Sequence, residues 1–185
     1  MTTLKVHTIE TAPEGSKEQL EASVKSFGML PGLHGVLASS PETLEAYKNL
    51  HSLFSNTSFN AEELTVVWQT INVENKCHYC VPAHTAIANM MKVDPELTEA
   101  LRNGSKLNNS KLQALQEMTL KILHNRGHVT AQDLQAFYEA GYGEQQVLEI
   151  ILGLAQKTIS NYTNHIANTP IDTPFQKFAW EAKTL

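Results

Sequence analysis

Two cysteines and a histidine stand at a spacing that can support chemistry. Cys77, Cys80 and His84 are separated by three and four residues, and the chain has no other cysteine. On a helix all three side chains would share one face. Pro82 lies between Cys80 and His84, and proline is tolerated in the first helical turn but costs about 3 kcal/mol deeper inside. We therefore predict a helix that begins close to Cys80.

A helix start at Cys80 would activate this thiol. Free N–H groups and the positive end of the helix dipole stabilise a thiolate at that position. His84 follows one turn later and can act as a base or proton shuttle. His78 and Lys76 add hydrogen-bond donors and positive charge nearby.

The spacing of the cysteines admits three interpretations. In a redox site, the Cys80 thiolate attacks an oxidant, forms a sulfenic acid and condenses with Cys77 into a disulfide. In a zinc site, His78 or His84 would join the two cysteines as a ligand, although no second cysteine pair is present to complete a structural site. In the third interpretation, both cysteines are small apolar core residues. The spacing favours the redox site and leaves the other two open.

Capping signals along the chain predict the helices that must position this motif. Polar N-cap residues precede apolar residues at helical spacing at several points: Ser40, Asn60, Asp94, Asn109 and Thr130. The last strong helix is expected from about Glu144 to Ala167. Residues 28–35 are rich in glycine and are predicted to form a loop. The C-terminal tail carries Phe175, Phe178 and Trp180, which suggest docking onto the body of the protein or onto a neighbouring subunit. We predict an all-α chain of about seven or eight helices in one domain, residues 1–185.

Composition narrows the class of protein. The chain has 185 residues and a formal net charge of -5, which argues against nucleic acid or an anionic membrane as a partner. The presumptive recognition helix of a helix-turn-helix, residues 144–151, has glutamates but no Arg or Lys, which also disfavours DNA. No apolar run reaches the length of a transmembrane helix, and residues 1–10 do not have the pattern of a signal peptide. We expect a cytoplasmic enzyme or binding protein.

The motif and its flanks resemble a known family. Residues 75–85, Asn-Lys-Cys-His-Tyr-Cys-Val-Pro-Ala-His-Thr, are similar to the signature of the carboxymuconolactone decarboxylase / AhpD-like alkylhydroperoxidase superfamily. Residues 27–34 are similar to its glycine-proline entry loop, residues 39–44 to its next helix start, and residues 161–169 to an Asn-rich segment of its peroxidase-related branch. The resemblance spans about residues 25–173 and leaves 174–185 as a tail.

The resemblance implies a fold, an activity and a set of roles. It implies an AhpD-like all-helical subunit that assembles as a homo-oligomer, often a trimer or hexamer. It implies a thiol-dependent peroxidase that reduces alkyl or hydrogen peroxide, in which Cys80 is peroxidatic, Cys77 resolves the sulfenic acid and His84 belongs to the proton relay. A dithiol or thioredoxin-like reductant would reset the disulfide, and no organic cofactor or metal is needed. Decarboxylases of the superfamily lack the cysteine pair, so lactone decarboxylation is a weaker alternative. A non-catalytic redox-sensing or binding protein of the same fold is the other.

Two positions depart from the family pattern. The alkylhydroperoxidases carry a relay glutamate twelve residues before the first cysteine, where this chain has Thr65. A two-residue insertion before the cysteines would align Glu63 with the relay glutamate of the family, but the position of Glu63 equally fits a helix cap. Glu74 is a weaker candidate for the relay carboxylate. Tyr79 stands where the family often has a histidine. These departures leave thiol redox chemistry intact and leave the relay open.

Two further histidines have a structural and a functional interpretation. His165 lies on the last predicted helix and is either a hydrogen-bonded structural residue or a second proton carrier beside the cysteines. His34 follows the glycine-rich segment and either lines the pocket or caps a turn.

Overall fold

The computed structural model describes residues 4–182, and the regular secondary structure in this part of the chain is helical, with no β-strand. It contains nine α-helices and one 3-10 helix, so the predicted all-α class is confirmed, but the predicted count of seven or eight is too low. The helices are α1 (Glu14–Phe27), α2 (Gly32–Leu37), α3 (Pro41–Ser55), α4 (Ala61–Glu74), α5 (Cys80–Met90), α6 (Pro95–Arg102), α7 (Ser110–His124), α8 (Ala131–Glu139), α9 (Glu144–Ala167) and η1 (Thr173–Phe178). No helix in this range is long and apolar enough to cross a bilayer.

The capping signals of the sequence are used as predicted. The side chain of Asn60 accepts a hydrogen bond from the Glu63 amide, and the Glu63 carboxylate accepts one from the Asn60 amide, which closes a capping box at the start of α4. Thr130 and Asp133 form the same arrangement at α8. These local contacts satisfy amides that the first helical turn leaves free.

The loop predicted over residues 28–35 is wrong in its second half, because α2 begins at Gly32. All six residues of α2 are buried, and the backbone of the N-terminal segment packs directly on it. A Cβ atom at Gly35 would lie 2.7 Å from the carbonyl oxygen of His7, so glycine is required by this close approach. Tertiary burial therefore overrides the loop preference of a glycine-rich segment.

The other unpredicted helix, α1, lacks a clear apolar stripe. Its buried residues are Ser16, Leu20 and Ser23, which follow helical spacing but include only one apolar side chain. The hydroxyl of Ser16 donates to the carbonyl of Ala38, which satisfies it in the interior. Because this helix packs largely through serines, its sequence shows little of the hydrophobic periodicity that predicts a helix.

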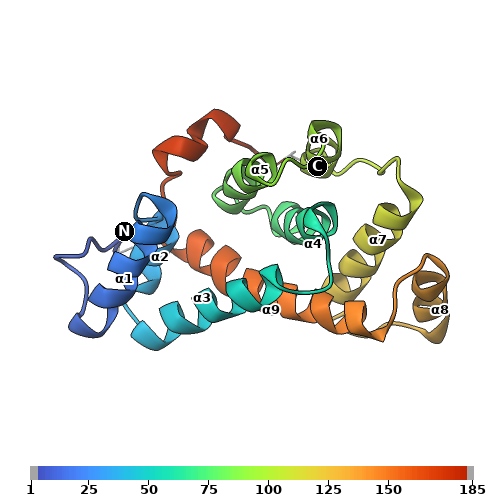
Figure 1. Ribbon diagram of the computed structural model, residues 1–185, viewed down its shortest axis with the longest axis horizontal. Coiled ribbons are helices and arrows are strands. Elements are labelled where there is room, and N and C mark those ends of the chain that lie inside the picture. The colour runs from blue at the N-terminus through green and yellow to red at the C-terminus, as the bar shows by residue number, and fades with distance from the viewer. Residues whose placement is uncertain (1–3, 183–185) are drawn as a thin grey trace.

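The helices enclose two apolar cores, and α9 runs along both (Figure 1). The first core lies among α4, α6, α7, α8 and the N-terminal half of α9, and it includes Trp68, Leu115 and Ile150. The second core lies among α1, α2, α3 and the start of α5, and it includes both cysteines. The dithiol is thus built into the second core.

The C-terminal segment packs on the body of the same subunit. In Figure 1 the red segment that contains η1 passes beside α5, and the two elements are in contact. The indole N–H of Trp180 donates to the carbonyl of Arg102, and the Arg102 guanidinium donates to the carbonyls of Phe178 and Ala179. Docking on the body, one of the two predicted alternatives, is therefore confirmed for residues 175–182, while the last three residues of the tail lie outside the described range.

Candidate active site

The two cysteines bracket the start of α5. Cys80 is the first residue of this helix and Pro82 the third, which confirms the predicted helix start. The chain leaves α4 through Lys76, whose φ of 53° is left-handed, and the Cys77 amide then donates to the carbonyl of Asn72. This tight connection turns both sulfur atoms into the second core.

Hydrogen bonds converge on the sulfur atoms. The Cys80 amide donates to the sulfur of Cys77 at 3.3 Å, and the Nδ2 group of Asn164 donates to the sulfur of Cys80 at 3.3 Å. Both cysteines are free and buried, at 0% and 2% exposure. Cys77 and Cys80 also interact with one another directly.

These contacts separate the acidities of the two thiols. Burial acts to raise the pKa of Cys80, but the hydrogen bond from Cys77, the charge of Lys157 and the amides of Asn164 and Asn161 outweigh it and lower this pKa. The same hydrogen bond, together with burial, raises the pKa of Cys77. Cys80 is therefore the thiolate of the pair, and Cys77 keeps its proton.

A buried lysine completes the site. Lys157 of α9 is fully buried, and its Nζ atom lies 2.9 Å from Nε2 of His84. Burial lowers the pKa of Lys157, and negative charge on Cys80 and Cys77 opposes that shift. Burial and then the charge of Lys157 lower the pKa of His84 well below its ordinary value, so His84 is a neutral imidazole.

Aromatic and imidazole rings wall the site on one side. The ring centroids of His84 and Trp68 are 4.8 Å apart, and Trp68 stacks in turn on His51. Gln156 links Trp68 to His51, since it accepts from the Trp68 indole and contacts Nδ1 of His51. His84 is consequently fixed by packing on one face and by Lys157 at one nitrogen.

A chain of side-chain amides ties α4, α5 and α9 together beneath the cysteines. Asn161 donates to Asn72, and Asn72 donates to Gln69 and to the carbonyl of Cys80. Gln69 donates to the carbonyl of Val81. Buried amide groups that are paired in this way fix the relative position of the helices they join.

The two residues between the cysteines are held by the C-terminal segment. The Tyr79 hydroxyl donates to Asp172 at 2.5 Å, and Asp172 also accepts from the Gly32 amide. The ring of His78 bonds the carbonyl of Thr169. The segment that follows α9 therefore closes over the dithiol.

The remaining candidate residues lie elsewhere. Glu63 is engaged in the capping box of α4 and in an ion pair with Lys111. The Thr65 hydroxyl donates to the carbonyl of Ala61, and Glu74 pairs with His124. Among the described residues, none of these three predicted relay residues forms a hydrogen bond or an ion pair with a cysteine or with His84.

The two further histidines also stand apart from the sulfur atoms. His165 is exposed on α9, next to the inward-facing Asn164. His34 is buried, bonds the hydroxyl of Ser23 and meets the edge of Tyr47. Tyr47 in turn interacts with Cys80, so His34 is one ring removed from the site.

Within residues 4–182 no group of three or more His, Cys, Asp or Glu side chains is placed to hold a metal ion. The zinc interpretation therefore lacks its third ligand there. His78 faces Thr169, and His84 faces Lys157.

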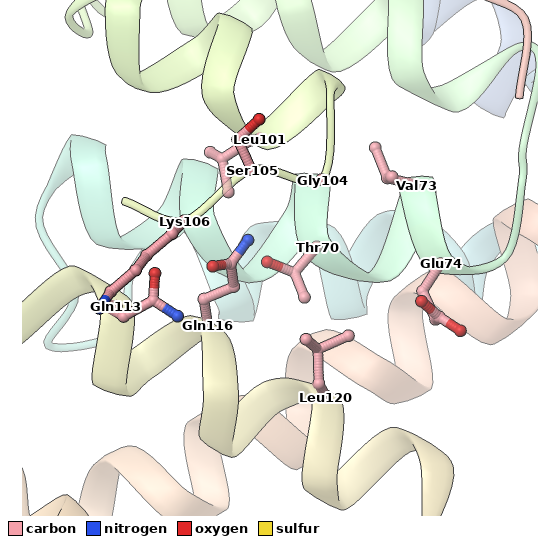
Figure 2. A pocket seen from close by; sticks show the side chains of 10 residues that line it. All are labelled: Thr70, Val73, Glu74, Leu101, Gly104, Ser105, Lys106, Gln113, Gln116 and Leu120. Carbon is pink, nitrogen blue, oxygen red and sulfur yellow. The ribbon is translucent and has the colours of Figure 1, made fainter. Parts of the chain in front are cut away.

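A pocket of about 340 Å³ opens on a different face of α4 (Figure 2). Thr70 of α4 and Gln116 of α7 stand on its walls, and Lys106 lies at its edge. Neither cysteine lines it, and nor does His84. This pocket is therefore separate from the cysteine site.

The sequence analysis missed Lys157 and the inward positions of Asn161 and Asn164 as site residues. A signal was present, because Gln156, Lys157, Ser160, Asn161 and Asn164 follow helical spacing and all of them are buried. A polar stripe on the inner face of a long helix indicates a buried network.

Comparison with known proteins identifies the fold. No protein-family model matches the chain, and neither does any curated protein sequence. Several solved structures are similar, and three of them match over nearly their whole length as follows. The first is an uncharacterized peroxidase-related protein from Ralstonia eutropha JMP134, described as an alkylhydroperoxidase AhpD core, with a TM-score of 0.77, 18% identity and 92% coverage of both chains. The second is an uncharacterized peroxidase-related protein from Silicibacter sp. TM1040, with a TM-score of 0.78, 17% identity and coverage of 94% of this chain and 93% of that one.

The third similar structure is a cysteine-to-alanine variant of the debrominase Bmp8 in complex with 2,3,4-tribromopyrrole, with a TM-score of 0.72 and 14% identity. It covers 96% of this chain and 95% of its own. The chain therefore has the AhpD-like fold that its cysteine motif predicted.

Proposed function

We propose that this protein is a dithiol oxidoreductase that reduces a small electrophile, with alkyl or hydrogen peroxide as the first choice. The observation that carries the proposal is the placement of Cys80 at the start of α5, where its amide donates to the sulfur of Cys77 and its own sulfur accepts from Asn164. A thiolate is the nucleophile in peroxide reduction, and a neighbouring thiol is what resolves the product.

The reaction balances with a dithiol as the electron donor. The Cys80 thiolate attacks the O–O bond of the hydroperoxide, which yields a sulfenic acid and, after one proton is taken up, an alcohol. The Cys77 thiol then displaces the hydroxyl of the sulfenic acid as water and forms the Cys77–Cys80 disulfide. An external dithiol reduces this disulfide and returns the proton, and it supplies both electrons.

The burial of both sulfur atoms supports a second candidate, a redox sensor. His78 and Tyr79, which lie between the cysteines, bond the C-terminal segment, so a disulfide in the second core would disturb these contacts. In a sensor the disulfide would form once and change the packing. In an enzyme a dithiol would recycle it.

A peroxide assay with thiol titration tests the proposal. Wild-type protein should lose two thiols for each tert-butyl hydroperoxide consumed and should turn over repeatedly with dithiothreitol. Cys80→Ser should consume none beyond background, and Cys77→Ser should consume one equivalent and stop at the sulfenic acid. Tribromopyrrole serves as a second electrophile, because a protein of the same fold is a debrominase.

The outcomes separate the candidates. If wild type consumes peroxide no faster than Cys80→Ser, the peroxidase proposal is wrong. Loss of two thiols that no dithiol restores would replace the enzyme with the sensor.

A further inference from the structure

The site holds a histidine whose second nitrogen has no partner. Nδ1 of His84 is buried and forms no hydrogen bond within the described residues, and the same is true of Oδ1 of Asn164. Asn164 bonds the sulfur of Cys80 through its other amide atom. Buried polar atoms are nearly always paired, so two unpaired atoms in one site point to a group that binds there.

The contact with Lys157 determines which ring nitrogen of His84 carries the proton. A lysine ammonium has donors and no acceptor. The 2.9 Å contact therefore makes Nε2 of His84 the acceptor and leaves the ring proton on Nδ1, the unpaired nitrogen. The Nδ1–H group of His84 is then a hydrogen-bond donor that is free within the described part of the chain. The Lys157 ammonium, at Nε2 of the same ring, holds a second proton.

No carboxylate neutralises this lysine. Lys157 forms no ion pair with Asp or Glu among the described residues, and the opposite charges that act on it are those of Cys80 and Cys77. Two other titratable groups, both on α3, lie around Lys157 and His84. His51 interacts electrostatically with Lys157 and with His84, and Tyr47 interacts with Cys80. The side chains that α4 contributes here, Trp68, Gln69 and Asn72, do not titrate. The site thus pairs one buried cation with one thiolate.

We infer that Lys157 and His84 form a two-step proton relay to the leaving group, in which a lysine of α9 takes the role expected of a carboxylate of α4. This inference rests on the proposed function and adds the source of its proton. As the Cys80 thiolate breaks the O–O bond, His84 gives its Nδ1 proton to the departing alkoxide and takes a proton from Lys157 at Nε2. The products are the Cys80 sulfenic acid, the alcohol and a neutral Lys157 amine.

The relay is reset when the disulfide is reduced. Condensation of the sulfenic acid with Cys77 releases water without net change in protons. Reduction by the external dithiol then yields the Cys77 thiol, the Cys80 thiolate and one proton. This proton binds Nδ1 of His84 while His84 returns its Nε2 proton to Lys157, which restores the starting tautomer and the ammonium. In this scheme Lys157 acts through His84 and is a positioning residue that stores the proton.

The variant Lys157→Met tests, without any peroxide, whether the charge of Lys157 stabilises the Cys80 thiolate. In a Cys77→Ser background a single thiol remains, and the pH dependence of its alkylation by iodoacetamide reports the pKa of Cys80. We expect Lys157→Met to raise the midpoint by about one pH unit or more, since an opposite charge nearby is removed. Lys157→Arg, which keeps the charge, should restore much of the shift. Circular dichroism and urea unfolding verify that each variant is folded.

Peroxides with different leaving groups test whether Lys157 and His84 deliver a proton. At a pH where the Cys80 thiolate is formed in both proteins, Lys157→Met should react with tert-butyl hydroperoxide about 100-fold or more slowly than wild type, because an alkoxide needs a proton to leave. With peracetic acid, whose acetate leaves without a proton, the two proteins should react at similar rates. Iodoacetamide, which releases iodide, should likewise not distinguish them.

Two results would overturn the inference. One is an alkylation midpoint that Lys157→Met leaves unchanged, and the other is an equal loss of rate with both peroxides. A wild-type protein that alkylates with the expected midpoint but reacts with neither peroxide would instead refute the proposed peroxide chemistry.

Discussion

Two buried imidazoles, His34 and His84, and the half-buried imidazole of His51 have no carboxylate partner among the described residues. Burial is the main cause that lowers the pKa of His34 to about 3, of His51 to about 4 and of His84 well below its ordinary value. In the unfolded chain each would titrate near 6.5. Between these limits the unfolded state binds more protons, so their contribution to stability is present above pH 6.5 and is lost as the pH falls.

His34 offers a clean test of this linkage because it does not touch the sulfur atoms. We expect His34→Phe, which keeps a ring between Phe27 and Tyr47, to weaken the acid sensitivity of folding. The slope of unfolding free energy against pH, measured by urea titration between about pH 4 and 6, should fall by about 1.4 kcal/mol per pH unit, the value for one proton.

His128, in the exposed loop after α7, supplies the control for that experiment. His128→Phe should leave the slope as it is in wild type. Equal slopes for His34→Phe and wild type would mean that His34 is charged or exposed in the folded state.

At the scale of helices, α9 carries the polar half of the site, and its position against α3 is set by one glycine. A Cβ atom at Gly153 would lie 2.6 Å from the ring of Phe54, which is itself fully buried. Lys157 follows Gly153 by one turn and Asn164 by three. The close approach of the two helices therefore also sets the depth of Lys157 and Asn164 beside the cysteines.

We expect Gly153→Ala to destabilise the fold by up to about 2 kcal/mol. Overpacking a core costs about 1–3 kcal/mol, against a gain of about 1 kcal/mol in helix propensity. The urea midpoint and the iodoacetamide rate at Cys80 measure the two consequences, loss of stability and displacement of α9.

Gly143→Ala is the matched control, because its Cβ would meet only the side chain of Gln146, at 3.5 Å. Gly143 is also the N-cap of α9, where alanine is less favourable than glycine. The control should therefore lose less stability than Gly153→Ala and should leave the iodoacetamide rate at Cys80 unchanged. A Gly153→Ala protein as stable as this control would show that Phe54 can move aside without cost.

At the scale of the whole molecule, α9 also presents an apolar outer face. Leu148, Ile151, Tyr162 and Ile166 are 67%, 44%, 55% and 66% exposed. They recur at helical spacing along one side of the helix, opposite the buried polar stripe. Such a stripe on a water-exposed helix favours burial against another subunit, in line with the homo-oligomer that the sequence motif implies.

We expect wild-type protein to run above its subunit mass of 20.5 kDa in light scattering. The double variant Leu148→Arg, Ile166→Arg should shift it toward that mass, since charge in an apolar interface is costly. Gln145→Arg, a polar exposed position on the same helix, should leave the mass unchanged. A monomeric wild-type protein would refute the predicted oligomer.

The sequence by itself determined the parts of this protein that depend on neighbours in the chain. Caps such as Asn60 with Glu63, and the tolerance of Pro82 only in a first turn, are local, so the helices of residues 41–167 and the start of α5 at Cys80 followed from them. The same locality placed Cys77 and Cys80 on one turn. The cysteine motif and its flanks also carried the resemblance to the AhpD-like fold.

Only the tertiary structure decided what surrounds the sulfur atoms. Lys157 is 73 residues from His84 in the chain, and Asn164 is 84 from Cys80, so no spacing rule joins them. Glu63 had the residue type expected of a relay, but its carboxylate caps a helix instead. Burial in the second core then turned a lysine and a histidine of ordinary appearance into groups of shifted pKa, because low polarity and a neighbouring charge act only once the chain has folded.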